Sequence, residues 1–326
     1  MKPTERSFAR RIDLMSLQLF VAVCELGSIG RAAEREFIAA SAVSKRLSEL
    51  EAAVDTPLLY RHSRGVTLTP AGESLLHHAR AVLFGLERMQ GELSEYADGV
   101  RGHVRMHANI SAIVQFLPED LGAFSRRHPQ IKIDLQEHLS ADVLQAVREG
   151  AADLGLCHAA CDGAAGHGGT QPDLQTRFYR ADRLVLVMPQ AHALSARAAV
   201  RFDDMLDWDI VGLHANSSIS LAMRQAAAAA GRPLRQRIQV TGLDAMCRMI
   251  DNGLGVGLLP DRAFALMRGV GRLHAVPLDE PWARRELRLV ARDFGTLPMT
   301  ARLLVAHLAP PAAAAAPAAE VAAAVS

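Results

Sequence analysis

The spacing of apolar residues near the N-terminus predicts three short helices in succession, over residues 16–26, 29–37 and 41–54. In each stretch the apolar side chains recur three or four positions apart, which places them on one face of a helix. These faces comprise Leu17, Phe20, Val21 and Cys24; Ile29, Ala32 and Ala33; and Val43, Leu47, Leu50 and Val54. Because the two alanines are small, we expect another helix to approach the second stretch closely.

The polar positions along these helices indicate a helix-turn-helix unit. Gly27 tolerates the left-handed backbone that ends a helix, and Ser28 can accept a hydrogen bond from the first turn of the next one. The outer face of the third helix carries Ser41, Ser44, Lys45 and Ser48. Short hydroxyls and a cation suit a phosphate-lined groove, so we interpret residues 41–54 as a candidate recognition helix.

Residues 57–69 form two short apolar runs around a polar turn at 62–65, a pattern that predicts a β-hairpin. A hairpin directly after a helix-turn-helix is a wing, and we expect Arg61, His62 and Arg64 at its tip; a merely solvated hairpin tip is the alternative. Over 37–48 and 56–72 there are cations and no acids, which gives a local basic surface to a chain of formal net charge +1. Residues 1–12 are predicted to be a flexible basic arm, either solvated or touching a DNA backbone.

A long helix is predicted from Pro70 to residue 98, since proline at the first helical position sacrifices no hydrogen bond. Apolar residues recur along it at alternating spacings of four and three, which is a heptad seam. The seam consists of Leu75, Ala79, Val82, Leu86, Met89, Leu93 and Tyr96. We favour dimerisation through this seam over burial within the chain, so that two recognition helices on a two-fold axis would read a near-palindromic DNA site.

Beyond a hinge-like break at 99–102, apolar runs alternate with helical patterns. Strands are predicted over 104–110, 131–139, 152–158, 183–189, 208–213, 237–243 and 254–260, and helices over 118–129 and 141–150. This alternation is typical of an α/β fold with parallel strands. The Gly-rich stretch 161–173 is predicted to be a loop, and the Ala/Pro-rich tail 309–326 to be disordered.

Residues 13–83 resemble the N-terminal domain of LysR-type transcriptional regulators. The resemblance is carried by the segments LQLFVAVCELGSI, RAAEREF, SAVSKRLSELE, PLLYRHSRGVTLTPAGE and LLHHARAVL, which are colinear and nearly ungapped, and it continues more loosely to about residue 308. It implies a winged helix-turn-helix at 13–69, a linker and dimerisation helix at 70–98, and an effector-binding domain at 99–308. That domain would have two α/β subdomains of type 2 periplasmic-binding-protein-like fold, the first from 100–160 and 266–308 and the second from 161–265.

Two positions depart from the family pattern. The glutamine that often reads a base at the start of the recognition helix is replaced by Ala40, so base contacts are expected to shift to neighbouring residues or to a thymine methyl packed on Ala40. Gly30 lies inside the second helix, where glycine costs about 1 kcal/mol relative to alanine. The residues expected to contact DNA are Ser28, Arg31, Ala40, Ser41, Ser44, Lys45, Ser48, Arg61, His62 and Arg64.

Small polar residues follow several predicted strands of the α/β part, where ligands collect in such sheets. Ser111 lies seven residues before Pro118, the spacing at which the family places a ligand-binding serine before its Leu-Pro. Ser111 and Ser140 are the leading candidates for holding an anion, most simply a carboxylate, with a plain helix-capping role as the alternative. The full set of expected effector contacts is Asn109, Ile110, Ser111, Ser140, Cys157, His158, Asn216, Ser217 and Thr241.

Other chemistries are poorly supported. The cysteines and histidines of CHAACDGAAGH, which begins at Cys157, match no common zinc spacing, and no third group orients a Cys–His nucleophile. GLGVGLLP lacks the GxGxxG pattern and the following helix of a dinucleotide site. The four cysteines are too scattered for a disulfide framework, and the N-terminal segment has no apolar signal core. No run is long enough to span a membrane.

We therefore predict a cytoplasmic, non-enzymatic bacterial regulator of LysR type that binds double-stranded DNA sequence-specifically as a homodimer or homotetramer. A small effector of unknown identity, expected to be anionic, would modulate DNA binding and bending. RNA polymerase is considered as a partner, and no cofactor, metal or membrane is expected. Two alternatives remain: a small-molecule-binding protein or enzyme that uses the α/β domain, and a structural dimeric adaptor held by the long helix.

Overall fold

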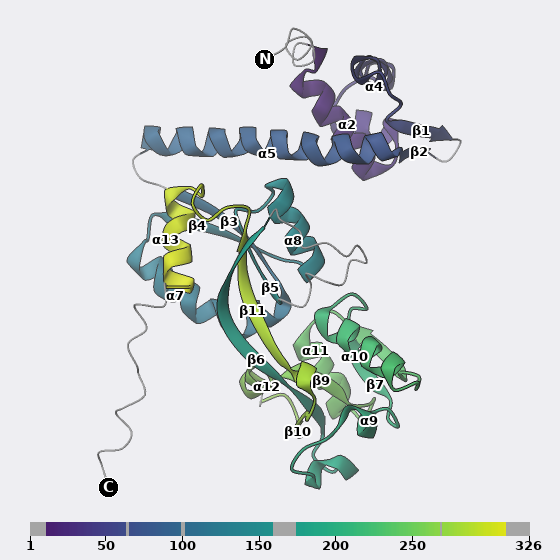
Figure 1. Cartoon of the computed structure of the whole chain (residues 1–326), viewed down its shortest axis with the longest axis vertical. Helices are drawn as coiled ribbons and strands as arrows, with labels where there is room; N and C mark the ends of the chain where they lie inside the picture. The colour runs from purple at the N-terminus through teal and green to yellow at the C-terminus, as the bar shows by residue number, and fades with distance from the viewer. Residues whose placement is uncertain (1–10, 63–64, 99–101, 159–173, 268, 311–326) are drawn as a thin grey trace. The chain divides into compact units, whose positions relative to one another are not determined.

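The computed structural model describes residues 11–62, 65–98, 102–158, 174–267 and 269–310 (Figure 1). Most of the expected arm and tail, the Gly-rich loop 161–173 and Arg64 lie outside these ranges. Contacts within the chain divide it into two compact units whose boundary falls near residue 100. In the part of the chain that the structure describes, no helix is both long and apolar enough to cross a membrane.

The first unit contains the predicted elements in the predicted order. They are α2 (Leu14–Leu26), α3 (Ile29–Arg35), α4 (Ala40–Val54), the antiparallel strands β1 (Leu59–His62) and β2 (Gly65–Leu68), and α5 (Pro70–Asp98). Helix α2 begins two residues earlier than expected because Asp13 caps it, accepting a 2.9 Å hydrogen bond from the Ser16 backbone N–H. Gly27 has the predicted left-handed backbone, with φ of 62°.

The hydrophobic core of the first unit is formed by the predicted faces of the three short helices. Ala32, Ala33, Val43, Leu47 and Leu50 are all buried, whereas Cys24, Ile29 and Val54 are half-buried at the edge of the core. Helix α2 is buried over more of its surface than a single face, including Leu19, Ala22 and Val23, since α3, α4, α5 and β2 all contact it. The helix-turn-helix is therefore organised around α2.

Strand β2 of the wing is attached to the turn of the helix-turn-helix. The Val66 N–H donates a 3.1 Å hydrogen bond to the Gly27 carbonyl. Gly65 has φ of +136°, and a Cβ atom at this position would lie 2.3 Å from the same carbonyl oxygen. Only glycine combines that backbone conformation with so close an approach, so Gly65 sets where strand β2 meets the helices.

Helix α5 has two different environments along its length. Ala79, the second residue of the predicted heptad seam, is buried in the core of the first unit, so for it the preference for dimerisation over intramolecular burial was wrong, and Leu75 is partly buried against the same core. Leu86 is half-buried, while Val82, Met89 and Leu93 are 46%, 51% and 60% exposed in the single chain. The candidate seam is thus confined to the half of α5 that extends beyond the small domain.

The second unit is an α/β structure. In chain order its elements are β3 (Gly102–Ala108), α6 (Ile110–Gln115), α7 (Leu117–Arg127), β4 (Ile131–Glu137), α8 (Ser140–Glu149), β5 (Leu154–His158), β6 (Gln175–Pro189), α9 (Phe202–Met205), β7 (Ile210–Leu213), α10 (Ser218–Ala229), β8 (Gln236–Val240), α11 (Leu243–Asp251), β9 (Gly257–Pro260), α12 (Asp261–Leu266), β10 (Leu273–Pro277), β11 (Arg284–Ala291) and α13 (Met299–Leu308). The described residues of this unit also contain two short 3₁₀ turns, Ala193–Ala196 and Pro281–Ala283.

Parallel pairing, which the sequence predicts for the whole sheet, holds only in part. Strand β3 pairs in parallel with β4 and β5, and β7 pairs in parallel with β8. Strand β11 is antiparallel to both β5 and β6, and β6 continues antiparallel to β9 and β10. The long strand β6 begins at Gln175, eight residues before the expected strand 183–189. The sequence did not indicate this part of the strand, because residues 175–178 are all exposed and do not alternate between apolar and polar side chains.

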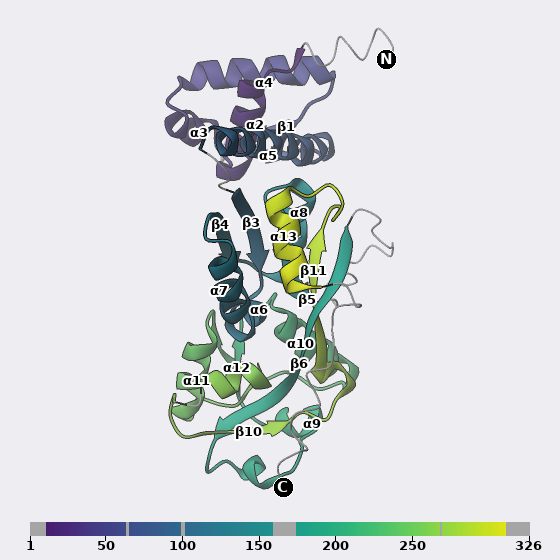
Figure 2. The same cartoon turned by 90° about the vertical axis from the view of Figure 1, so that its left-hand side faces the viewer.

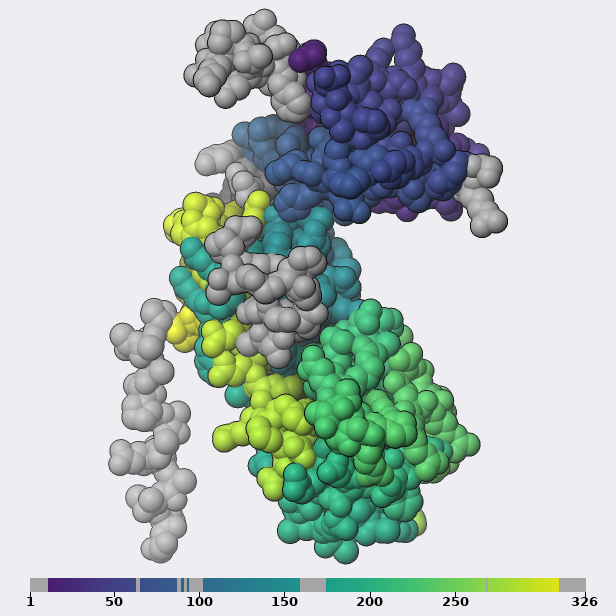
Figure 3. Space-filling model, turned by 45° about the vertical axis from the view of Figure 1, so that its right-hand side comes forward, coloured from purple at the N-terminus to yellow at the C-terminus, as the bar shows by residue number. Residues whose placement is uncertain are grey.

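Three clusters of buried apolar side chains lie in the described part of the second unit. One packs α8 against the strands, and the other two form the cores of the two subdomains. Tyr179 and Leu287 pack in the core of the first subdomain, whereas Leu184 and Ala283 pack in the core of the second. The chain therefore changes subdomain within β6 and at the start of β11, which run side by side (Figure 1), and not at the expected positions 160/161 and 265/266. Helices α7 and α13 contact each other on one face of the first subdomain's strands, and α8 packs on the opposite face. Figure 2 shows α12 beside β6 in the second subdomain, and in Figure 3 the yellow-green residues leading into β11 lie against the green second subdomain.

A candidate nucleic-acid interface and a candidate ligand cavity

One side of α4 is exposed and carries mostly small side chains. Ala40, Ser41, Lys45 and Ser48 are exposed, and Ser44 is half-buried. The N-cap residue is Ala39, which has no side-chain oxygen to cap the helix. The first N–H groups of α4 are thus left for water or an anion, and the small side chains around them let a phosphate backbone come close.

Arg61 lies across α4 and not at the wing tip, which corrects the expectation for this residue. Its guanidinium donates to the Ser44 hydroxyl at 3.1 Å and to the Ser48 hydroxyl at 3.4 Å, and it lies 3.5 Å from a Glu51 carboxylate oxygen. Glu51 in turn accepts hydrogen bonds from the backbone N–H groups that begin β1. Two serines on α4 are therefore oriented by a strand of the wing, and their hydroxyl protons remain available to an acceptor.

The other residues expected to contact DNA have different environments. The Ser28 hydroxyl caps α3, 3.4 Å from the Arg31 N–H, while the Arg31 guanidinium donates to the Leu26 carbonyl at the end of α2. His62 is exposed, with its Nε2 atom 3.4 Å from the Thr67 hydroxyl. Lys45 is exposed and lies 3.9 Å from Glu49, one turn along the helix. Arg31 is thus the candidate most engaged in local structure.

A cavity of about 290 Å³ opens between the two subdomains of the second unit. It is lined from the first subdomain by the start of α6 and by the β4–α8 connection, and from the second by the ends of β7 and β8 and the start of α10. The lining residues are Asn109, Ile110, Ser111, Glu137, His138, Leu139, Ser140, Asp142, Leu213, His214, Ser217, Ser218, Ile219 and Thr241. Strand ends and helix starts therefore converge on it, as expected for a ligand site in such a fold.

Six of the nine predicted effector contacts line this cavity. The Asn109 amide donates a 3.1 Å hydrogen bond to the Ser140 hydroxyl, and its carbonyl oxygen caps α6 by accepting from Ala112 N–H at 3.0 Å. The Ser217 hydroxyl caps α10 in the same way, accepting from the Ser220 N–H at 3.2 Å. Ser217 thus has a capping role. The capping alternative concerned Ser111 and Ser140; the described hydrogen bonds of Ser111 involve its backbone carbonyl, and the Ser140 hydroxyl accepts from the Asn109 side chain.

Three predicted contacts lie elsewhere. Cys157 is buried beneath α8, and Asn216 is exposed outside the lining. His158 is buried with its Nδ1 atom 3.3 Å from the Glu286 carbonyl. Burial lowers the pKa of His158 to about 3, with the Arg285 guanidinium contributing in the same direction. A neutral, enclosed imidazole does not suit the anion-binding role expected for it.

The sequence reasoning missed five polar residues of the lining. Glu137 ends β4 and His138 follows it, His214 follows β7, and Asp142 and Ser218 lie in the first turns of α8 and α10. The rule that singled out Ser140, namely residues at the carboxyl end of a strand, would also have found Glu137 and His138. His138 stacks on His107 with 4.4 Å between ring centroids. Among the described lining residues the full charges are two carboxylates, with no lysine or arginine.

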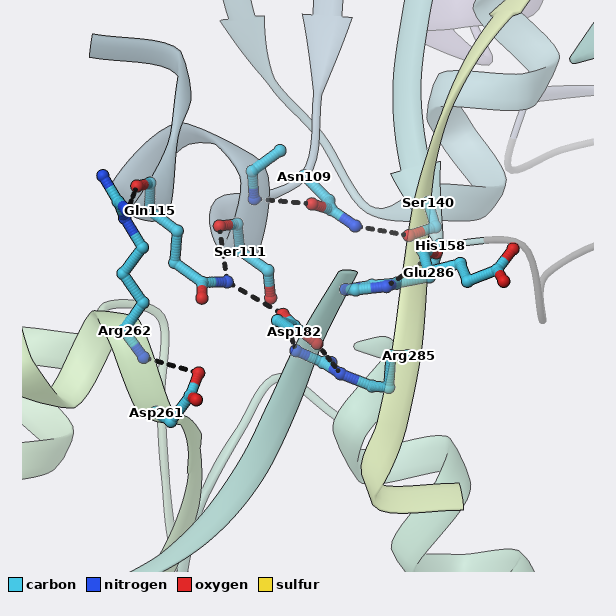
Figure 4. A network of polar contacts seen from close by, with 11 residues as sticks. Asn109, Ser111, Gln115, Ser140, His158, Asp182, Asp261, Arg262, Arg285 and Glu286 are labelled. Atoms are coloured by element: carbon cyan, nitrogen blue, oxygen red, sulfur yellow. Dashed lines mark hydrogen bonds and ion pairs between the residues drawn. The ribbon is translucent and has the colours of Figure 1, made fainter. Parts of the chain in front are cut away.

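A buried polar network lies where β6 and β11 cross between the subdomains (Figure 4). Arg285 on β11 makes two contacts with the Asp182 carboxylate on β6, at 2.8 and 2.6 Å, and the Asp182 side chain is fully buried. The Gln115 amide, at the end of α6, donates to Asp182 at 2.8 Å and to the Ser111 carbonyl at 2.9 Å. Arg262 on α12 of the second subdomain donates to the Gln115 carbonyl. Helix α6 therefore connects the cavity to the crossover strands.

Two family profiles match this chain. The one described as "Bacterial regulatory helix-turn-helix protein, lysR family" covers residues 14–73, and the one described as "LysR substrate binding domain" covers residues 97–311. Among curated proteins, the uncharacterized HTH-type transcriptional regulator YbhD of Escherichia coli K12 is 25% identical over 296 residues, 91% of this chain and 90% of that protein. The transcriptional activator IlvY of Salmonella typhimurium is 27% identical over 266 residues, 77% and 83% of the two chains.

Solved structures give the same fold. CbnR complexed with its target DNA aligns with a TM-score of 0.63 at 19% identity, over 91% of this chain and 99% of that one. The effector-binding domain of QuiR in complex with shikimate aligns with a TM-score of 0.54 at 14% identity, over 64% and 95%. These likenesses confirm the predicted fold class: a winged helix-turn-helix, a long helix and a two-subdomain α/β part of type 2 periplasmic-binding-protein-like fold.

Proposed function

The chain belongs to the LysR family of bacterial helix-turn-helix regulators, and from this premise we propose that α4 reads an operator sequence while the cavity between the subdomains holds a small effector. The protein is a DNA-binding transcriptional regulator by family. The observation that carries the residue assignment is the exposed face of α4, on which Arg61 orients two serine hydroxyls beside Lys45.

The proposed DNA contacts divide into two kinds. Ala40 and Ser41, at the exposed start of α4, are positioned for base edges if that end of the helix enters the major groove. Ser44, Ser48 and Arg61 form a hydrogen-bonded group whose donors suit phosphate oxygens. Lys45 adds a positive charge that its exposed partner Glu49 only weakly offsets.

We further propose that the protein self-associates through the exposed part of the α5 stripe. Val82, Met89 and Leu93 are apolar, exposed and spaced by whole heptads or half-heptads. A second copy of the same helix would bury them and would place two α4 helices on a two-fold axis, as a near-palindromic operator requires. Since its DNA lies in the bacterial cytoplasm, the protein is proposed to act there.

The effector is proposed to be small and to carry no large uncompensated negative charge. The cavity offers hydroxyls and helix starts, which suit one carboxylate, but its described lining also holds Glu137 and Asp142. A negative charge on the ligand about 6 Å from a carboxylate would be repelled by roughly 3 kcal/mol at an effective dielectric constant of about 20. This favours a neutral or zwitterionic compound over the simple anion suggested by the sequence.

Binding in the cavity is proposed to act through α6. Ser111 at its start faces the ligand, and Gln115 at its end touches both the Asp182–Arg285 pair and Arg262 of the other subdomain. A ligand that prefers one closure of the subdomains would therefore shift the contact between Gln115 and Arg262. The enzyme and adaptor alternatives are not favoured by any contact in the described residues.

DNA binding can be tested by electrophoretic mobility shift with the DNA upstream of the protein's own gene and of the neighbouring gene. The intact chain should bind one of these fragments selectively at physiological salt. Lys45→Ala should weaken this binding by about 1–3 kcal/mol and lower the salt slope by about 1. Lys132→Ala, an exposed lysine on β4, is the matched control and should change neither. Absence of selective binding at any salt would exclude the proposal.

The cavity can be tested separately by screening small acids, amino acids and sugars for thermal stabilisation of the intact protein. Ser111→Ala should abolish the stabilisation by a compound that works on the wild type, and operator binding without that compound should stay unchanged. Ser195→Ala is the control, because the Ser195 hydroxyl donates a 2.7 Å hydrogen bond to the His192 carbonyl and lies outside the cavity lining. An equal response of Ser111→Ala and wild type would remove Ser111 from the site.

A further inference from the structure

Phe37, in the turn between α3 and α4, combines two unfavourable features. Its backbone has φ of 55°, which is the left-handed region that bulky side chains rarely adopt. Its side chain is 97% exposed, more than any other large hydrophobic residue in the described part of the chain. A scattered exposed apolar residue is ordinary, but one held in a strained conformation is not.

The turn itself explains why the backbone is left-handed but not why the residue is phenylalanine. The Phe37 N–H bonds to the Glu34 carbonyl at 3.3 Å, and the Ile38 N–H bonds to the Ala33 carbonyl at 3.0 Å. This is how a helix ends when the following residue is left-handed, and glycine or asparagine is the usual choice there. Either would relieve the strain and remove an exposed aromatic ring, so the stability of the single chain does not account for Phe37.

The surroundings of Phe37 favour a nucleic acid as the missing partner. Phe37 lies two residues before Ala39, the N-cap of α4, and the residues that follow it, Ala39, Ala40 and Ser41, are exposed and small. The carboxylate next to it, Glu36, is already paired with Arg35 at 3.0 Å and with the Gln18 amide at 2.9 Å. An aromatic ring beside an uncapped helix start can therefore approach a DNA groove without a free carboxylate immediately next to it in the chain.

We propose that Phe37 is a DNA-contacting residue, whose ring packs against a thymine methyl group or a deoxyribose at the edge of the groove that receives α4. This inference rests on the proposed function of α4. It gives this chain an apolar contact near the position where Ala40 offers no hydrogen-bonding side chain. Phe37 would then supply shape and methyl recognition in place of a polar base reader.

The test compares Phe37→Asn with wild type, because asparagine tolerates the left-handed backbone and removes the ring. Operator affinity is expected to fall about tenfold, equivalent to about 1.4 kcal/mol. The salt dependence of binding should not change, since no charge is lost. The melting temperature of the intact protein should stay the same or rise by about 2–4 °C. Phe37→Tyr, which keeps the ring, should retain wild-type affinity.

Two controls separate the possible causes. Asp55→Gly relieves the backbone strain of the other left-handed non-glycine residue described, at the far end of α4. It should raise the stability of the protein while its affinity for the operator stays within about twofold.

Lys45→Ala tests the DNA-binding role of α4 itself. If the wild type binds no operator, the proposed function has failed. If Lys45→Ala weakens operator binding and Phe37→Asn does not, only the proposed role of Phe37 has failed.

Light scattering on each variant excludes the other partners. A change in the oligomeric state of Phe37→Asn would assign the ring to a contact between copies of this chain and overturn the proposal. A lower melting temperature for Phe37→Asn would make the ring structural and overturn it equally. Reduced affinity with unchanged assembly, unchanged salt slope and undiminished stability is the result that supports it.

Discussion

At the scale of single residues, the chain contains titratable groups whose burial ties stability to pH. His158 on β5 is enclosed, with its Nδ1 atom near the Glu286 carbonyl, and the described structure offers its Nε2 atom no hydrogen-bond partner. Burial lowers its pKa to about 3, and burial also lowers the pKa of His107 on the adjacent strand β3. The His158 imidazole is therefore neutral in the folded protein at mildly acidic pH, where a histidine of the unfolded chain is protonated.

The second unit should lose stability as the pH falls. An unfolded histidine with a pKa near 6.5 takes up a proton that folded His158 refuses, so the free energy of unfolding should fall by about 2 kcal/mol between pH 7 and pH 5 from this residue alone. Urea titrations followed by tryptophan fluorescence would measure it, since Trp208 and Trp282 both lie in the second unit. His158→Gln should flatten this dependence; an unchanged slope would contradict the buried, neutral imidazole.

At the scale of elements, two glycines in the first unit have opposite roles. Gly30 lies in the first turn of α3 and is exposed, and a Cβ there would meet only the Ser28 hydroxyl at 3.8 Å. Gly65 begins β2 and touches the Gly27 carbonyl in a conformation that other residues avoid. The same substitution should therefore change stability in opposite directions at the two sites.

Gly30→Ala should stabilise the first unit by about 0.5–1 kcal/mol, because alanine loses less conformational freedom in a helix. Gly65→Ala should destabilise it by about 1–3 kcal/mol, because the new methyl group meets a backbone oxygen and the backbone is strained. Calorimetry of the intact protein would record both as shifts of the transition that belongs to the first unit. If Gly30→Ala is destabilising, that position has a packing role that the open space does not reveal.

Helix α5 makes a prediction about assembly. Met89 and Leu93 are exposed, and introducing a charge into a helix–helix seam there should be costly. Leu93→Asp should weaken self-association at least tenfold, measured by light scattering over a concentration series. Leu266→Asp replaces an exposed leucine of α12 and is the control that should leave assembly unchanged. Equal behaviour of the two variants would place the interface elsewhere.

At the scale of the whole molecule, a buried ion pair joins the paired strands β6 and β11 where both pass from one subdomain of the second unit to the other. Asp182 accepts from Arg285 and from Gln115, so one carboxylate joins both crossover strands and α6. A buried pair is not in itself strongly stabilising, but removing one partner leaves the other charge uncompensated. The pair therefore makes the crossover intolerant of single substitutions.

Arg285→Gln should lower the free energy of unfolding of the second unit by about 3–5 kcal/mol. Arg288→Gln, on the same strand, breaks an exposed pair with Glu286 at 2.8 Å and should cost less than about 1 kcal/mol. Tryptophan fluorescence during urea unfolding would compare the two variants directly. Similar losses for both would mean that the Asp182 carboxylate is solvated in solution.

How far the sequence alone determined the structure depends on how local each signal is. The end of α2, the start of α3 and the apolar face of α4 follow from Gly27, Ser28 and the spacing of Val43, Leu47 and Leu50, because capping and helical periodicity act within a few residues. The start of α5 at Pro70 follows for the same reason. The cavity was located largely correctly because strand ends meet at one edge of a sheet, a rule that needs only the order of elements.

Tertiary structure decided what depends on residues distant in the chain. The position of Arg61 over α4 depends on Ser44, Ser48 and Glu51 together, and no local pattern connects them. Leu75 and Ala79 follow the heptad but pack against the core of their own domain, since periodicity shows that a face is apolar and not what covers it. Likewise the first half of β6 has no apolar pattern; it is a strand only because β11 supplies its hydrogen bonds.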